Sequence, residues 1–241
     1  MAKRRTAVVI GVGAVNGLGA AVAQRVAREG LHVTVAGRTE SRLAAVVESI
    51  ARAGGSAEAV VTDATREDAV QALFEQVTAG GSLELAVYNA GNNTPGRLTE
   101  MEADYFEAAW RIGCFGGFLF GREAARRMLP GGGTLIFTGA SASLRGRAGF
   151  GAFNAAKGGL RLLAQALAKE CGSEGLHVAH VVVDGGIDGE TLRKRFPSFA
   201  EEAGERLIDL NGLADAFWFL HQQPARAWSF ELDLRSKSEP W

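Results

Sequence analysis

The chain has 241 residues, of which 47% are hydrophobic and 22% are charged, and its formal net charge is −1. This length fits one large α/β domain, and the small charge gives no field that would draw the protein to nucleic acid or to an anionic membrane surface. No stretch reaches the roughly 18–20 apolar residues that span a membrane. The basic start with its short apolar run is expected to be a buried first strand rather than a signal peptide.

The two cysteines, Cys114 and Cys171, form neither a CxxC pattern nor a metal-ligand pattern. Free thiols in a reducing compartment are the simplest interpretation of this usage. We therefore expect a cytoplasmic protein without a structural disulfide and without a metal site.

Apolar runs alternate with amphipathic stretches from the start of the chain. Near-continuous apolar runs predict buried strands at 6–13, 31–37, 57–63, 83–91, 133–141, 176–186 and 229–235. Apolar residues at helical spacing predict helices at 18–30, 40–54, 66–80, about 104–128, roughly 150–172 and 212–222. No linker or repeat interrupts the alternation. It predicts one α/β domain over 1–241, a doubly wound parallel sheet with helices on both faces.

A glycine-rich stretch, GVGAVNGLG, joins the first predicted strand to the helix that follows it. Glycines let backbone N–H groups approach a pyrophosphate closely, and the N-terminus of a helix adds partial positive charge. In a doubly wound sheet, ligands bind beyond the carboxyl ends of the strands, where the strand order reverses. The stretch therefore predicts a nucleotide site, with a plain tight turn as the alternative.

Five motifs, spread over nearly the whole chain, resemble those of the short-chain dehydrogenase/reductase family and occur in the family's order. They are GxxxGxG through Gly13, Gly17 and Gly19, TDA at 62–64, YNAG at 88–91, FNAAK at 153–157 where the family has YxxxK, and DGGID at 184–188 where the family has a PG-containing loop. The chain is identified as a member of this family, and the resemblance implies a single-domain Rossmann-type fold.

The resemblance implies a dinucleotide cofactor and a set of residues that hold it. That set is Gly13, Asn16, Gly17, Leu18, Gly19, Arg38, Asp63, Ala64, Asn89, Ala90, Gly91, Lys157, Gly185 and Ile187. Lys157 would bind the nicotinamide ribose, with a solvated helix lysine as the alternative. An acidic residue after the second strand would select NAD, but Gly37 and Arg38 stand there. Because a guanidinium suits a 2′-phosphate, NADP(H) is predicted, with an ordinary surface arginine as the alternative.

Three catalytic positions of the family lack their usual side chain. The tyrosine position holds Phe153, the serine position aligns with Ala140, and the asparagine position aligns with Gly113. Ser141 would reach the serine position if the loop were one residue shorter, so the predicted catalytic positions are Lys157, Ser141 and Phe153. Loss of a general acid typically costs about 10²- to 10⁴-fold in rate.

Two functions follow from this pattern. In the first, the chain is an NADP(H)-binding protein, such as a sensor or a partner subunit, with tyrosine-dependent carbonyl chemistry absent or strongly weakened. In the second, it is an active NADP(H)-dependent oxidoreductase that reduces an activated double bond or uses another proton donor. The candidate donors are Ser141, Ser143, Asp184 and Asp188, although Asp184 is more simply a turn cap. His180, in the middle of a predicted strand, is expected to be a core residue.

Residues 187–210 resemble the variable substrate lid of the family. Their arginines and Lys194 suit an anionic substrate or a cofactor phosphate, although a solvated charged segment is the commoner explanation. The resemblance also implies a homotetramer or homodimer built through the two long helices and the last strand. The expected partner is a small-molecule substrate or a nucleotide ligand, with no nucleic acid and no membrane.

Overall fold

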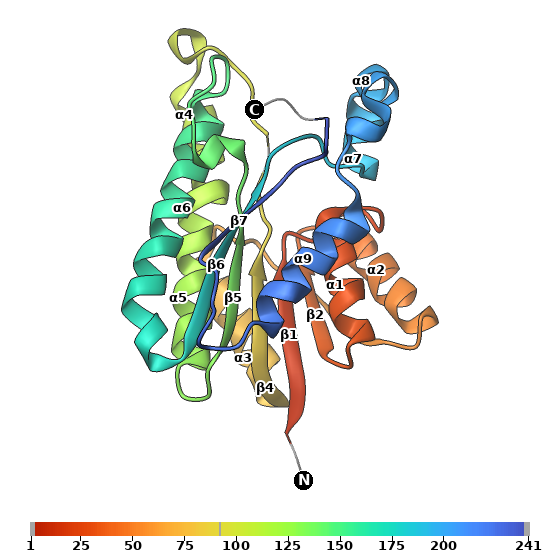
Figure 1. The fold of residues 1–241 in the computed structure, drawn as a ribbon, viewed down its shortest axis with the longest axis vertical. Helices are drawn as coiled ribbons and strands as arrows, with labels where there is room; N and C mark the ends of the chain where they lie inside the picture. The colour runs from red at the N-terminus through yellow and green to blue at the C-terminus, as the bar shows by residue number, and fades with distance from the viewer. Residues whose placement is uncertain (1–2, 92, 239–241) are drawn as a thin grey trace.

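A computed structural model, which describes residues 3–91 and 93–238, contains one sheet of seven parallel strands (Figure 1). The strand order is β3-β2-β1-β4-β5-β6-β7. The strands are β1 (Arg4–Ile10), β2 (His32–Gly37), β3 (Ser56–Val61), β4 (Gly81–Tyr88), β5 (Gly133–Thr138), β6 (Leu176–Val183) and β7 (Glu231–Leu234). The order reverses at β1, because β2 lies on one side of it and β4 on the other. The predicted doubly wound sheet is confirmed. The reversal of strand order lies at the carboxyl ends of β1 and β4, which is where sheets of this kind generally bind ligands.

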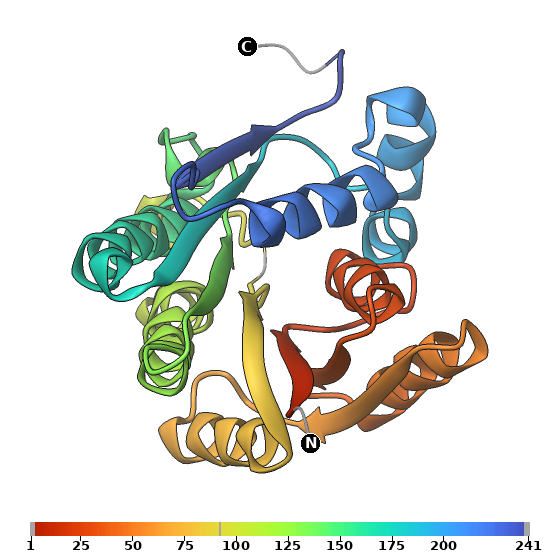
Figure 2. The same ribbon diagram turned by 60° about the horizontal axis from the view of Figure 1, so that its bottom comes forward.

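Helices cover both faces of the sheet (Figure 2). One face carries α1 (Leu18–Arg28), α2 (Glu40–Arg52) and α9 (Leu210–Gln222), and the other carries α3 (Glu67–Ala79), α5 (Gly116–Met128) and α6 (Gly151–Cys171). Alternation along β1 explains this layering. Ala7 and Val9 pack in the first core cluster, whereas Val8 and Ile10 pack in the second. A strand buried on both faces needs the continuous apolar run that the sequence shows.

The long helix predicted at 104–128 is interrupted. It consists of α4 (Ala103–Trp110), a π-helical turn (Arg111–Phe115) and α5. A π turn disturbs the regular i→i+4 bonding of the backbone, so a carbonyl there needs another donor. The buried Tyr88 hydroxyl supplies it by donating to the Ile112 carbonyl over 2.6 Å. The helix is thus fixed at its irregular turn by a side chain from β4.

The carboxyl edge of the sheet is covered by the segment after β6. The predicted polar segment 187–210 contains two short helices, α7 (Glu190–Arg195) and α8 (Pro197–Ala203), which lie above α1 in Figure 1. β6 ends at Val183, three residues earlier than predicted, because the chain turns there toward these helices. In the described part of the chain, no helix has both the length and the apolar character that a membrane span requires.

Candidate active site

The glycine-rich loop after β1 packs too tightly for larger residues at several positions. A Cβ atom at Gly11 would lie 2.4 Å from the Ala90 nitrogen, and one at Gly37 would lie 2.6 Å from the Val12 carbonyl oxygen. Gly19 faces the Asn89 amide, whose nitrogen donates to the Gly11 carbonyl over 3.1 Å. These contacts pack the carboxyl ends of β1, β2 and β4 closely against one another.

The residues at the start of α1 suit the phosphate groups of a dinucleotide. Gly13 is the exception in the tightly packed loop, because a Cβ there would meet no atom within 4 Å. The N-cap of α1 is Gly17, which offers no side chain to bond the first backbone N–H groups. These donors and the positive end of the helix remain available to an anion. Asn16 is exposed, and Leu18 and Gly19 are buried in the first turn of the helix.

Arg38 and Asp63 interact electrostatically after the carboxyl ends of β2 and β3, on the adenine side of the predicted site. Arg38 is exposed directly after β2, and Asp63 accepts hydrogen bonds from the Thr65 backbone and hydroxyl at 2.9 and 2.8 Å. Burial raises the pKa of Asp63, but these bonds and the charges of Arg38 and Arg66 hold it below its ordinary value. Asp63 is therefore a fixed anion within the field of Arg38, next to the buried Ala64.

Lys157 reaches the centre of the site from the second turn of α6. Its side chain is 5% exposed, and its Nζ donates to the Thr138 carbonyl over 2.7 Å. A Cβ at Gly91 would lie 3.2 Å from the same Nζ, so the ammonium also lies against the end of the YNAG motif. Burial lowers the pKa of Lys157 from 10.5 to about 8. The lysine thus lies where β4 and β5 end, as the motif predicts, and its ammonium makes one side-chain hydrogen bond within residues 3–91 and 93–238.

Phe153 is half-buried in the first turn of α6, one helical turn before Lys157. Neither tyrosine of the chain replaces its missing hydroxyl. The Tyr88 hydroxyl is bonded to Ile112, and the Tyr105 hydroxyl donates to the Pro95 carbonyl over 3.1 Å. The site therefore has no uncommitted phenol.

The loop that follows β5 carries the serine candidates. Ser143 is buried, and its hydroxyl accepts from the Ala140 backbone N–H over 3.1 Å, so it closes the local turn. Ser141 is half-buried, and its hydroxyl has no bonded partner among the described residues. Of the two serines, Ser141 is the one free to meet a ligand.

Asn154, inside the FNAAK motif, holds this loop against α6. Its amide nitrogen donates to the Ala142 and Arg145 carbonyls at 3.2 and 2.6 Å, and its amide oxygen accepts from the Arg147 N–H at 3.1 Å. One side chain thus supplies hydrogen bonds to three backbone groups that an irregular loop would otherwise leave to water. The only sign of this role in the sequence is an amide side chain next to Phe153.

Gly113 occupies a position where the π-helical turn and α6 meet closely. A Cβ there would lie 2.6 Å from the Cβ of Ala156, inside van der Waals contact. Gly116 and Gly117 are similar, because their added Cβ atoms would lie 2.5 Å from the Tyr88 hydroxyl and 2.3 Å from a Leu160 methyl group. The glycines of this stretch are therefore explained by helix packing.

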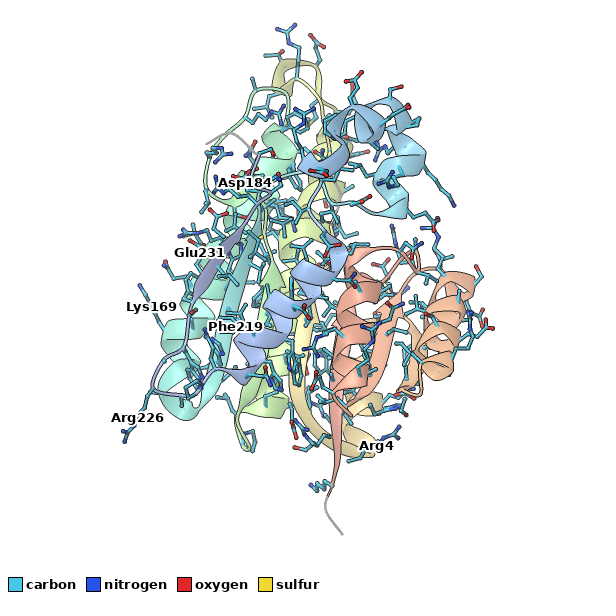
Figure 3. All side chains as sticks on the ribbon, turned by 45° about the vertical axis from the view of Figure 1, so that its right-hand side comes forward. Arg4, Lys169, Asp184, Phe219, Arg226 and Glu231 are labelled. Atoms are coloured by element: carbon cyan, nitrogen blue, oxygen red, sulfur yellow. The ribbon has the colours of Figure 1, made fainter. Side chains whose placement is uncertain are left out.

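Asp184 is buried at the end of β6, near the top of the sheet edge in Figure 3. The Arg145 guanidinium reaches its two carboxylate oxygens at 3.2 and 3.1 Å, and Arg235 approaches at 3.4 Å. The arrangement ties the loop after β5 to the segment after β7. A carboxylate engaged by two guanidiniums is better explained as this tether than as the proton donor considered from the sequence.

The segment 187–210, which was predicted to be a substrate lid, begins against the glycine-rich loop. The Glu190 N–H donates to the Asn16 carbonyl over 2.8 Å, and a Cβ at Gly189 would lie 3.1 Å from the same oxygen. Gly185 has a φ of +149°, which glycine adopts readily, and Ile187 packs against the first core cluster. Asp188 is paired with Arg193 at 2.6 Å, and Glu190 with Lys194 at 2.6 Å. Several charges of the segment 187–210 therefore form ion pairs within the segment.

The fold and the glycine-rich loop together define a Rossmann-type α/β protein. Residues 6–200 match the family model described as short chain dehydrogenase. Because that match covers most of the chain, the protein belongs to the short-chain dehydrogenase family. The sequence-based identification is confirmed at this level.

Individual relatives agree with this assignment. A short-chain dehydrogenase structure from Rhodopseudomonas palustris is 38% identical, with a TM-score of 0.83, and the match covers 96% of this chain and 98% of that one. A 3beta-hydroxysteroid dehydrogenase of Mediterraneibacter gnavus is 34% identical over 171 residues, which are 70% of this chain and only 62% of that relative. A metagenomic short-chain oxidoreductase solved with NADP is 25% identical, with a TM-score of 0.81 and 98% coverage of both chains.

Proposed function

We propose that this chain binds NADP(H) on a short-chain dehydrogenase scaffold and has lost, or strongly weakened, the family's tyrosine-dependent carbonyl chemistry. The observation that carries the proposal is the pairing of Lys157 with Phe153. A buried ammonium stands where a cofactor ribose would lie, and the residue one turn earlier is a phenyl ring with no proton to give. Both phenol hydroxyls of the chain are committed to backbone carbonyls.

The nucleotide would be held by the residues predicted from the sequence. The N-terminus of α1 and Gly13 would receive the pyrophosphate, Lys157 the nicotinamide ribose, and Asn89, Ala90 and Gly91 would line the crevice floor. A bound NADP(H) would supply or accept a hydride. Arg38 supports the choice of NADP(H), because it is an exposed guanidinium beside Asp63 with no acidic residue at the end of β2.

The cofactor choice has its own test. Arg38→Ala should weaken NADPH binding by about tenfold or more, the effect of one charge-assisted contact, and should leave NADH binding nearly unchanged. Calorimetric titration of both nucleotides measures this loss of affinity. Arg42→Ala is the matched control, because Arg42 is an exposed arginine four residues further along the chain, in the first turn of α2. Tighter binding of NADH than NADPH by the unmodified protein would refute the role given to Arg38.

A second function rests on a specific observation. The Ser141 hydroxyl is half-buried and free among the described residues, so an active oxidoreductase could use it to protonate an alkoxide or to orient a water molecule. The named dehydrogenase relative makes this alternative concrete. NADPH oxidation with a panel of carbonyl and enone substrates separates the two functions. Turnover above roughly 1 per second, the low end of typical enzymes, would reject the first proposal.

The assembly and location are further proposals. We infer a homodimer or homotetramer, because apolar side chains are exposed on the outer helices. Trp110 and Phe118, 38% and 36% exposed, lie on α4 and α5, and Leu162, 62% exposed, lies on α6. Sedimentation of the purified protein tests this proposal, and a monomer at micromolar concentration would contradict it. We infer a cytoplasmic location because both cysteines are free thiols.

A further inference from the structure

Asp184, the residue that follows β6, is a carboxylate that folding removes almost completely from water (Figure 3). It is 2% exposed, and in this it resembles Glu123 on α5, which is 4% exposed. A buried carboxylate opposes folding unless opposite charges and hydrogen bonds compensate it. The protein therefore maintains a costly group at the edge of the sheet where the candidate site lies, and this group requires an explanation.

The two buried carboxylates differ in where their partners come from. Glu123 pairs with three arginines that lie within four residues of it along the chain, at 2.9, 3.4 and 3.9 Å. Asp184 pairs with Arg145 from the loop after β5, at 3.1 Å, and with Arg235 from the segment after β7, at 3.4 Å. The ion pairs of Glu123 are therefore local, whereas those of Asp184 join three segments that are distant in the sequence.

The backbone of Asp184 is fixed as well. Its N–H donates to the Leu234 carbonyl over 2.8 Å, which continues the pairing of β6 with β7 beyond the last residue of β6. The chain then turns through Gly185, whose φ of +149° glycine adopts readily. The carboxylate and the N–H together make Asp184 a fixed point immediately before the loop 185–188.

The other side of the loop 185–188 is bonded to the segment that follows α8. The Ile208 N–H donates to the Gly186 carbonyl over 2.8 Å, and the Asp188 N–H donates to the Ile208 carbonyl over 2.9 Å. The loop is therefore held between two anchors. One is the segment that carries the short helices, and the other is Asp184 on the side of the sheet.

Arg145 extends the same constraint to the loop after β5. Its N–H donates to the Ser141 carbonyl over 3.1 Å, and its own carbonyl accepts from the Asn154 amide over 2.6 Å. Its Nη2 contacts both carboxylate oxygens of Asp184, at 3.2 and 3.1 Å. The ion pair thus spans the ends of β5 and β6, and it sets the distance between the loop that carries Ser141 and the loop 185–188.

We propose that Asp184 is a positioning residue that fixes the loop 185–188 for the nicotinamide half of a bound cofactor. The inference rests on the proposed function, in which this loop is part of the cofactor site. Asp184→Asn keeps the shape of the side chain and removes its charge, so Arg145 and Arg235 lose the carboxylate that draws them to the end of β6. The loop should then lose its anchor on the side of the sheet, while the adenine half of the site, after β2 and β3, stays as it is.

Two nucleotides separate this positioning role from general destabilisation. NADPH and adenosine 2′,5′-bisphosphate, which has no nicotinamide half, are titrated by calorimetry into the unmodified protein, Asp184→Asn and Arg145→Gln. We expect NADPH affinity to fall about tenfold in Asp184→Asn and about threefold in Arg145→Gln, because a charged anchor of the loop is lost wholly or in part. Affinity for the bisphosphate should stay unchanged in both variants.

Glu123→Gln is the matched control, because it neutralises a carboxylate of similar burial on α5, and it should leave both affinities unchanged. An equal loss of affinity for the two nucleotides in Asp184→Asn would assign this residue to general stability and overturn the proposal. Undiminished NADPH affinity in a folded Asp184→Asn protein would overturn it as well. If Asp184→Asn does not fold, the same two outcomes are decided on Arg145→Gln.

A measurement without nucleotide keeps the inference separate from the proposed function. Backbone hydrogen exchange is compared in the same proteins without ligand. The Asp188 and Arg145 N–H groups should exchange about tenfold faster in Asp184→Asn, because the loop hydrogen bonds that they make open more often, and Glu123→Gln should leave both rates unchanged. Unchanged rates in Asp184→Asn overturn the proposal. Absence of NADPH binding by the unmodified protein would reject the proposed function, and the exchange rates would then decide whether Asp184 holds the loop.

Discussion

The glycine-rich loop after β1 and the segment 139–157 lie at the same edge of the sheet and differ in what they contribute. The first acts through its backbone, and its glycines are tightly packed except at Gly13, where a ligand could enter. The second acts through side chains, and at 140 and 153 it has a methyl group and a phenyl ring in place of hydroxyls. We therefore propose that nucleotide binding through the backbone is preserved where proton chemistry through side chains is not.

The second segment is nevertheless well ordered by interactions of its own. Asn154 bonds the loop three times, Arg145 ties it to Asp184, and Lys157 bonds Thr138. Although hydroxyl groups are absent at 140 and 153, the segment 139–157 keeps a defined conformation through these bonds. This difference teaches that the geometry of the site and its proton chemistry depend on separate residues, and the predictions below test that separation.

The largest effect is expected from introducing a tyrosine as the general acid at position 153. Phe153→Tyr, alone and with Ala140→Ser, should raise NADPH-dependent carbonyl reduction by about 10²- to 10⁴-fold, because the lysine and the loop are already in place. Steady-state rates on a broad ketone panel measure this gain. If neither variant gains activity while both still bind NADPH, the two regions have diverged together, and the proposed separation is wrong.

The next effect concerns stability in acid. The pKa of His180 is about 4 in the folded protein and 6.5 ordinarily, so the unfolded chain binds the extra proton between these values. Above pH 6.5 this group is neutral in both states and does not change the free energy of unfolding. As the pH falls from 6.5 toward 4, the unfolded chain takes up the proton, and the free energy of unfolding falls by about 3 kcal/mol. Urea unfolding of the unmodified protein and of His180→Gln at pH 7 and pH 4.5 should show a smaller acid loss in the variant. Equal losses would place the acid sensitivity in other groups.

The smallest effect is expected at the packing contact between Gly113 and α6. Gly113→Ala should destabilise the protein by about 1–3 kcal/mol, because the new methyl group overlaps Ala156. Gly158→Ala is the control within α6, where a Cβ meets no atom within 4 Å, and it should stabilise the helix by up to about 1 kcal/mol. Thermal unfolding of both variants measures the difference. A stable Gly113→Ala protein would show that this glycine is not a packing requirement.

Much of the fold could be predicted from the sequence because it follows from local patterns. The β/α alternation predicted the doubly wound sheet, and Lys157 lies beside Gly91 and Thr138, as its motif implies. The interactions that shape the segment 139–157 were not predictable in the same way. Asp184 meets Arg145 and Arg235, which are 39 and 51 residues away along the chain, and His180 meets Glu231 across a strand pair. Such pairings depend on strand order and register, which no local pattern specifies.

The central claim, a preserved nucleotide site without its acid, is tested most directly by titrating NADPH into the unmodified protein and into Lys157→Met. Methionine keeps the apolar length of the side chain and removes the buried charge. Loss of a charge-assisted hydrogen bond should weaken NADPH binding by about 10- to 100-fold. The same variant should be more stable toward urea, because burial of the ammonium opposes folding. Equal NADPH affinity in the two proteins, or no binding by the unmodified protein, would contradict the account.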